Sequence, residues 1–203
     1  MKKKIIVISV LLLITSGLFA KGIYNGNIQL TGSYNTNELQ YISTTAPTLK
    51  IDTIDFGLET WHTFKLPILL EVGFMFDLDM GFGSTNLIAE EWNIGMNLYG
   101  LFGPAIAINV LNIVKFNFAL GPTFDFTITT ADDTSLVSYG SGFGINFQTL
   151  FFPLSPVSPI FGYKFAASVG EMIYGADSKT AELYTEHIIS LKNQVYLGIS
   201  FNW

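Results

Sequence analysis

A two-residue alternation of large apolar and mostly small or polar side chains runs from Leu70 to Phe82. One face carries Leu, Val, Phe, Phe, Leu, Met and Phe, and the other carries Glu, Gly, Met, Asp, Asp and Gly. Successive residues of a β-strand point to opposite faces, so the segment is predicted to be a strand with one bulky apolar face. The interior of a small barrel is too narrow for these bulky groups, whereas burial in lipid would stabilise each by about 1.5–3 kcal/mol. The pattern therefore predicts a membrane barrel strand with its apolar face outward.

Seven further segments alternate in the same way. They lie near residues 24–34, 54–61, 92–98, 114–128, 137–148, 161–170 and 195–203. Eight is an even number, as expected for a single-chain bacterial barrel, and it defines the smallest class of such barrels. The sequence thus predicts an all-β fold, an eight-stranded antiparallel up-and-down transmembrane β-barrel. Pro122 cannot donate a ladder hydrogen bond, so we expect a bulge or kink there.

The composition supports this fold class. Charged residues are only 13% of the chain, against about 25% in a typical soluble domain. The most apolar later segment, from Leu101 to Val114, is interrupted by Pro104 and Asn109. The apolar residues alternate with other residues and do not form long runs. This pattern is typical of a closed barrel in a membrane, because a barrel pairs every backbone polar group between its strands.

The N-terminus is typical of an exported protein. Lys2, Lys3 and Lys4 precede the uncharged run from Ile5 to Leu13, and Ala20 is a small residue suited to cleavage. We predict a signal peptide over residues 1–20, cleaved near Ala20, and one barrel domain over residues 21–203. An uncleaved anchor is the alternative, but the apolar run is shorter than the roughly 20 residues that span a bilayer.

Residue usage excludes several classes of protein. The chain has no Cys, which excludes a lipid anchor on Cys and any disulfide framework. All ten positive charges are Lys, and loss of three of them with the signal peptide takes the formal charge from −6 to −9. A nucleic-acid partner is therefore not expected.

The connecting segments alternate between two kinds. Polar segments cover residues 35–50, 83–91, 130–135 and 175–186, whereas shorter or Pro-bearing segments cover 62–67, 104–111 and 152–159. Outer-membrane barrels have long outer loops and short periplasmic turns. The polar set is therefore expected outside, with both chain ends in the periplasm.

These features together resemble a known family. The signal peptide, the alternating strands and the terminal Phe201-Asn202-Trp203 look like the small bacterial outer-membrane barrels typified by the membrane domain of OmpA, OmpX and OmpW. The resemblance implies a location in the outer membrane, contact with its lipids, and recognition of the last strand by the barrel-assembly machinery. The residues that would carry this recognition are Tyr196, Leu197, Ile199, Phe201 and Trp203. No motif selects one subfamily.

Charged residues on the inward faces form two predicted groups. Lys115 and Lys164 map toward the periplasmic half and are expected to pair with Glu59 or Glu71 and plug the lower lumen, because an unpaired charge there is costly. The alternative is that they contact water only.

The second group consists of acidic residues that map toward the outer half. They are Asp55, Asp77, Asp79, Asp125 and Glu171. They either form an acidic vestibule that attracts cations or are solvated wall residues. Asp77 and Asp79 could both offer oxygens to Ca²⁺, but no loop completes a ligand set, so we predict no metal site and no cofactor.

Enzymatic function is not expected. The only histidines, His62 and His187, map to opposite ends of the barrel. His187 has Glu186 beside it and Ser178 in the same loop, but adjacent strand residues face opposite ways, which disfavours a catalytic triad.

The leading hypothesis is a structural or small-solute passage role. A route for small apolar solutes would need an apolar upper lumen, which the predicted carboxylates oppose. The alternative is a surface adhesin or ligand-binding barrel that acts through residues 35–50 and 175–186, where Tyr41, Ile42, Leu183 and Tyr184 lie.

Overall fold

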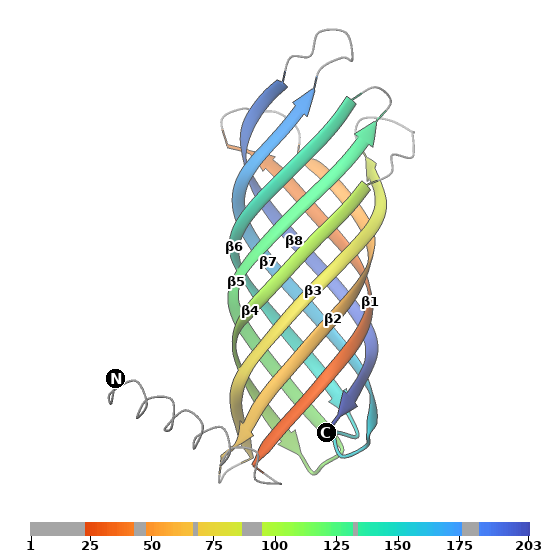
Figure 1. Ribbon diagram of the computed structural model, residues 1–203, viewed down its shortest axis with the longest axis vertical. Coiled ribbons are helices and arrows are strands. Elements are labelled where there is room, and N and C mark those ends of the chain that lie inside the picture. The colour runs from red at the N-terminus through yellow and green to blue at the C-terminus, as the bar shows by residue number, and fades with distance from the viewer. Residues whose placement is uncertain (1–22, 43–47, 67–68, 87–94, 132–133, 176–182) are drawn as a thin grey trace, which may run out of the picture.

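The described part of the chain is a closed antiparallel barrel (Figure 1). The computed structural model describes residues 23–42, 48–66, 69–86, 95–131, 134–175 and 183–203. The strands are β1 (Tyr24–Tyr41), β2 (Leu49–Lys65), β3 (Leu70–Asn86), β4 (Gly95–Val110), β5 (Val114–Ala131), β6 (Thr134–Phe151), β7 (Val157–Gly175) and β8 (Leu183–Asn202). Each strand pairs with its neighbours in sequence, and β8 closes onto β1. The predicted eight-stranded up-and-down fold is confirmed.

Among the described residues, no helix has the length and apolar character needed to cross a membrane. The predicted signal peptide, residues 1–20, lies outside the described residues.

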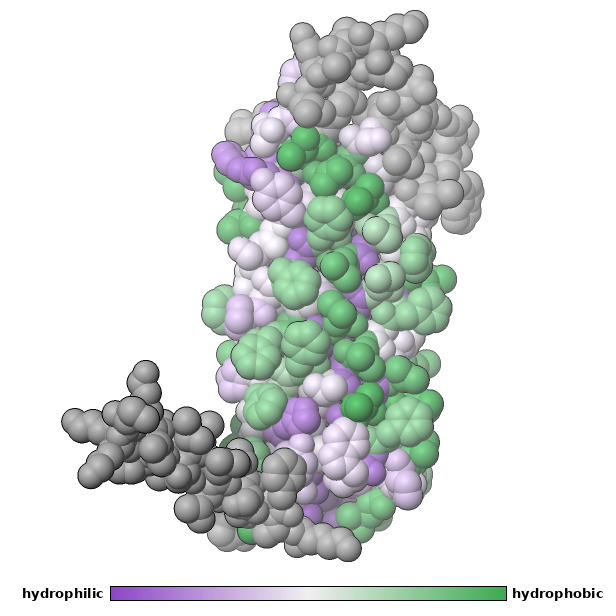
Figure 2. Space-filling model, in the orientation of Figure 1, coloured by the Kyte–Doolittle hydropathy of each residue, from purple (hydrophilic) through white to green (hydrophobic). Residues whose placement is uncertain are grey.

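Bulky apolar side chains lie on the outside of the barrel. Phe56, Phe143 and Leu197 are 64%, 66% and 64% exposed, and Figure 2 shows apolar side chains over the wall that faces the viewer. The neighbouring inward positions on these strands, such as Asp55 and Asn146, are buried. This inside-out arrangement is the one that the alternation predicts, and it places the polar side chains in the lumen.

The strand pairing fixes the tilt and width of the barrel. Starting at Gln29 and stepping across each ladder in turn leads back to β1 at Leu39, ten residues farther along. Such a stagger requires strands inclined by roughly 35–45° to the barrel axis. Figure 1 shows that the strands are tilted. Eight strands at this tilt enclose an interior that side chains can fill.

The strands are longer than the sequence predicts. They run from 16 residues in β4 to 20 residues in β8, although about 9–11 residues suffice to cross a membrane. Most of the predicted loop over residues 35–50 belongs to β1 and β2, and residues 183–186 belong to β8. Above Tyr34 the outward side chains Thr36 and Glu38 are polar, so apolar alternation stops while inward alternation continues.

The end of the barrel where β1 begins and β8 ends has short turns. At one of them, Leu111 and Asn112 have φ of 54° and 57°, and the N–H of Ile113 donates to the Val110 carbonyl at 3.1 Å. Two consecutive positive φ values are the signature of a type I′ hairpin turn. The predicted turn over residues 104–111 is therefore wrong, because β4 continues to Val110. Outer-membrane barrels have short periplasmic turns, so this end matches the one predicted to be periplasmic, and we name it the periplasmic end.

Two prolines interrupt one ladder without shifting its register. The β4–β5 pairing is broken between Leu101↔Thr123 and Ala105↔Ala119, beside Pro104 and Pro122, yet the register is the same on both sides. The β5–β6 pairing runs without a break through Pro122. Of the bulge or kink expected at Pro122, the bulge is wrong, because the register continues without an inserted residue.

Candidate functional site

A cluster of buried charges occupies the middle of the lumen. The Lys164 ammonium lies 2.8 Å from one carboxylate oxygen of each of three acidic side chains, Glu59, Asp77 and Asp79. None of the four residues is more than 1% exposed. Gln194 donates a further hydrogen bond of 2.8 Å to Asp79. Asp77 and Asp79 thus converge with Glu59 on Lys164 and do not form an open outer vestibule.

A second ion pair lies nearer the periplasmic end. The Lys115 ammonium is 2.6 Å from Glu71 Oε2, which also accepts a hydrogen bond of 2.6 Å from Thr63. Asn25 donates to the other oxygen, Oε1, at 2.7 Å. Both carboxylate oxygens of Glu71 are therefore satisfied, as a buried charge requires.

A third ion pair, which the sequence analysis missed, lies toward the outer end. Lys192 Nζ is 3.3 Å from Asp55 Oδ2 and 4.1 Å from the centre of the Tyr99 ring. The Asn97 amide donates to the same Asp55 oxygen at 3.3 Å. Lys192 lies before the predicted start of the last strand at residue 195, but its even number matches the inward positions Gln194 and Tyr196.

The other two predicted acidic residues point in opposite directions. Asp125 is buried in the lumen and accepts a hydrogen bond from Ser168 Oγ. Glu171 instead lies on the outer wall, where it accepts a hydrogen bond from Tyr139 and lies 3.8 Å from His187 Nδ1. The inward positions of β7 are even-numbered, so the expectation that Glu171 faces the lumen is corrected.

An apolar layer fills the lumen close to its outer end. It consists of six buried side chains, Leu39, Leu49, Ile51, Leu136, Met172 and Ile188. We name this group the apolar cap. This layer differs from the polar upper lumen that the carboxylates predict. Leu39, Leu49, Leu136 and Ile188 lie in stretches predicted as loops or outside the predicted strands.

The inward charges of the lumen do not balance. Among the described residues, three buried lysines face six buried carboxylates: Asp55, Glu59, Glu71, Asp77, Asp79 and Asp125. Atom Oδ1 of Asp77 and of Asp79 has no hydrogen-bond partner within the described residues. In that same part of the chain, no group of three or more His, Cys, Asp or Glu residues is arranged to hold a metal ion. The lumen is thus acidic and dominated by ion pairs.

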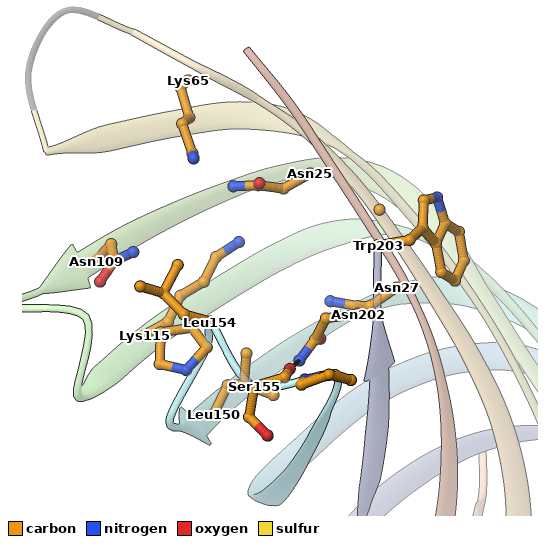
Figure 3. A pocket seen from close by; sticks show the side chains of 13 residues that line it. Asn25, Asn27, Lys65, Asn109, Lys115, Leu150, Leu154, Ser155, Asn202 and Trp203 are labelled. Atoms are coloured by element: carbon orange, nitrogen blue, oxygen red, sulfur yellow. Dashed lines mark hydrogen bonds between the residues drawn. The ribbon is translucent and has the colours of Figure 1, made fainter. Parts of the chain in front are cut away.

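The periplasmic mouth of the lumen contains a cavity of about 290 Å³ (Figure 3). Its polar lining comes mainly from the last inward positions of five strands: Asn25, Asn27, Lys65, Asn109, Lys115 and Asn202. The turn between β6 and β7 contributes Pro153, Leu154, Ser155 and Pro156. We name this cavity the periplasmic vestibule.

Solved structures share this architecture. OprG from Pseudomonas aeruginosa superposes with a TM-score of 0.61 and 8% identity, over 89% of this chain and 96% of that chain. Ail of Yersinia pestis superposes with a TM-score of 0.50 and 9% identity, over 88% of this chain and 99% of that chain. The chain has the fold of the small outer-membrane β-barrels. No protein-family model matches its sequence, and no curated protein matches it. Outer-membrane neighbours support an outer-membrane location.

The last strand of the barrel separates the five predicted assembly residues into two groups. Leu197, Ile199, Phe201 and Trp203 are exposed on the outer wall. Tyr196 points inward, where its hydroxyl donates to Asn146 at 2.7 Å. These four side chains form an apolar strip along the outer face of β8. Their role in assembly stays a prediction.

The two histidines lie far apart. His62 contacts Tyr24 and stacks on Phe74 near the periplasmic end, whereas His187 lies beside Glu171 near the outer end. The predicted partner Ser178 is outside the described residues.

Proposed function

We propose that this protein is a closed outer-membrane barrel with a structural role, in which passage is limited to small solutes that can cross a plugged lumen. The observation that carries this proposal is the Lys164 cluster in the middle of the barrel. Its three carboxylate contacts at 2.8 Å hold opposite walls together, since β2, β3 and β7 all contribute.

The plug is energetically costly to open. Separating a buried ion pair leaves an uncompensated charge, at a cost of about 3–5 kcal/mol. Any solute would also have to pass the Lys115–Glu71 and Lys192–Asp55 pairs and the apolar cap. These successive layers oppose a continuous column of water.

Conductance in planar bilayers tests the plug. We expect the refolded wild-type barrel to pass little current, and Lys164→Ala to pass more, with a preference for cations, because three carboxylates then lack their common partner. Lys50→Ala, at an exposed lysine of β2, is the control and should match the wild type. A wide-open wild-type channel, or a folded Lys164→Ala barrel with unchanged current, would contradict the proposal.

A second candidate function is binding of a surface ligand at the outer end. It is favoured by strands that extend beyond the length needed to cross the membrane and by polar outward residues there, such as Glu38, Lys50 and Asp52. Ail, a fold neighbour, has been crystallised with the heparin analogue sucrose octasulfate. Because this chain has a formal charge of −6, we expect a ligand other than a polyanion.

Shortening the outer connections separates the two functions. Deletion of residues 43–47 or 176–182 should abolish adhesion of proteoliposomes to immobilised extracellular-matrix protein if the outer end binds a ligand. Equal adhesion of the deleted and intact barrels, or none for either, removes this candidate and leaves the sealed lumen untouched.

We infer that the barrel is not an enzyme. Ser141 and His187 both line a hollow on the outer wall, but they belong to β6 and β8, so β7 separates them by about 10 Å at the usual strand spacing. A serine nucleophile must lie within hydrogen-bond reach of its histidine. Unchanged envelope lipids on expression of His187→Ala are therefore expected, and altered acylation would refute the inference.

A further inference from the structure

The periplasmic vestibule is a positively charged site on an acidic protein. None of its thirteen lining residues is Asp or Glu, whereas two, Lys65 and Lys115, are cationic (Figure 3). The chain as a whole has 16 acidic and 10 basic residues, so this lining departs from the average. Glu71 neutralises Lys115 at 2.6 Å, so the net positive charge at this mouth is that of Lys65, and it favours an anion.

One of the two lysines has its charge available. Lys115 is engaged by Glu71 at 2.6 Å. Lys65 is exposed at the end of β2 and makes no ion pair with any residue that the structure describes. In Figure 3 its ammonium points into the same space as the Asn25 amide. Lys65 is thus the group that a bound anion would contact first.

The rest of the lining could contact other parts of a ligand besides its anionic group. Asn25 donates to Glu71 and Asn27 accepts from Gln29, whereas both polar groups of Asn109 are bonded to Asn112. The Asn25 carbonyl and the Asn27 amide N–H groups therefore remain to bond to a peptide group. Leu150, Leu154 and Pro153 supply an apolar surface beside them. A volume of about 290 Å³ is at the small end for a ligand pocket, which suits a ligand of a few residues.

The vestibule is also held in shape by the fold. Asn202 Nδ2 donates to the Ser155 carbonyl at 2.7 Å and to Ser158 Oγ at 2.8 Å, and its backbone N–H donates to the Pro156 carbonyl at 3.0 Å. These bonds fix the β6–β7 turn against the end of β8. A preformed pocket loses less conformational entropy when a ligand binds.

We propose that the periplasmic vestibule binds the C-terminal carboxylate of a short peptide. The carboxylate contacts the Lys65 ammonium, and the peptide groups bond to the Asn25 carbonyl and the Asn27 amide N–H groups. The apolar side chains lie against Leu154 and Pro153. The ligand would come from the periplasmic side, where this mouth opens. This binding is separate from the plug formed by the Lys164 cluster, none of whose side chains lines the vestibule.

Calorimetry on the folded full chain in detergent micelles tests the proposal. The probe is N-acetyl-alanyl-alanine, and its C-terminal amide is the matched control ligand. We expect the acid to bind and the amide to bind at least tenfold more weakly, since charge-assisted hydrogen bonds are about twice as strong as neutral ones. Lys65→Met should weaken binding of the acid about tenfold, whereas Lys50→Met, the same change at the other end of β2, should leave it unchanged.

Three results with the acid and the amide would overturn the proposal. They are equal binding of acid and amide, no binding of the acid, and full affinity in a Lys65→Met barrel that still shows the heat-dependent gel shift of a folded barrel. Inorganic phosphate at matched ionic strength should not displace the peptide. Displacement at equal concentration would reveal a simple anion site and exclude the peptide assignment.

Discussion

At the scale of single residues, the Lys192–Asp55 pair lends itself to a double-mutant cycle. The pair is buried, with 3.3 Å between Nζ and Oδ2, and Lys192 also lies over the Tyr99 ring. Lys192→Met or Asp55→Asn alone should each lower the free energy of unfolding by about 3 kcal/mol, because one charge is left buried without its partner. The double variant should lose much less than the sum of the two. Urea titration followed by tryptophan fluorescence measures all four proteins, and strict additivity would show that the pair is not coupled.

The residues of the lumen were predictable only in part. The inward orientation of four residues follows from the alternation of inward and outward positions within clearly patterned strands. They are Lys115, Lys164, Glu59 and Glu71, and the structure places all four inside. Which carboxylate meets which lysine depends on register around the whole barrel, and no local pattern contains that information. The alternation alone does show that Glu171 points outward, since the inward residues of β7 have even numbers. The same rule would have found Lys192.

At the scale of strands, the β4–β5 contact has no room for an added methyl group. A Cβ on Gly103 would lie 2.0 Å from the Leu120 carbonyl oxygen, and one on Gly121 would lie 2.1 Å from that of Phe102. Pro104 and Pro122 already remove ladder donors here. Gly103→Ala or Gly121→Ala should therefore destabilise the barrel by about 1–3 kcal/mol, or prevent closure of the ladder.

Gly32→Ala is the matched control for this prediction. Its added Cβ meets nothing within 4 Å, so its stability should be that of the wild type. The folded fraction after refolding into detergent, read from the heat-dependent gel shift, compares the three variants. Wild-type folding of both β4 and β5 variants would show that the strands can move apart at this point.

The limits of the strands were harder to predict than their number. Outward apolar residues reveal a strand only where it faces lipid, so the predicted β1 ended near Tyr34 although the strand continues to Tyr41. Beyond the lipid, only the inward positions Asn35, Asn37 and Leu39 still mark the strand. Their polarity is mixed, and a mixed pattern does not distinguish a strand from a polar loop.

At the scale of the whole molecule, the inside-out arrangement was accessible from the sequence because lipid imposes it on every strand. The apolar cap was not, since it assembles from segments of β1, β2, β6, β7 and β8 that lie above the lipid-facing band. In that region β1 and β2 carry polar side chains such as Glu38 and Lys50 on the outside, while the apolar cap lies within. We therefore expect water, and not lipid, around this part of the barrel wall.

The expected change from lipid to water along the outer wall predicts how well the barrel tolerates a charged side chain at different positions along its axis. Leu58 and Glu38 both point outward on the β1–β2 hairpin, Leu58 within the apolar band and Glu38 above it. Leu58→Lys should lower the free energy of unfolding in lipid vesicles by about 2–4 kcal/mol, the cost of a lysine near the bilayer centre. Glu38→Lys should cost no more than about 1 kcal/mol, because its side chain is already in water. In a detergent micelle, whose apolar belt adapts to the protein, the difference should shrink. Equal costs in vesicles would mean that the bilayer covers both positions, and the extension of the strands beyond the membrane would then be wrong.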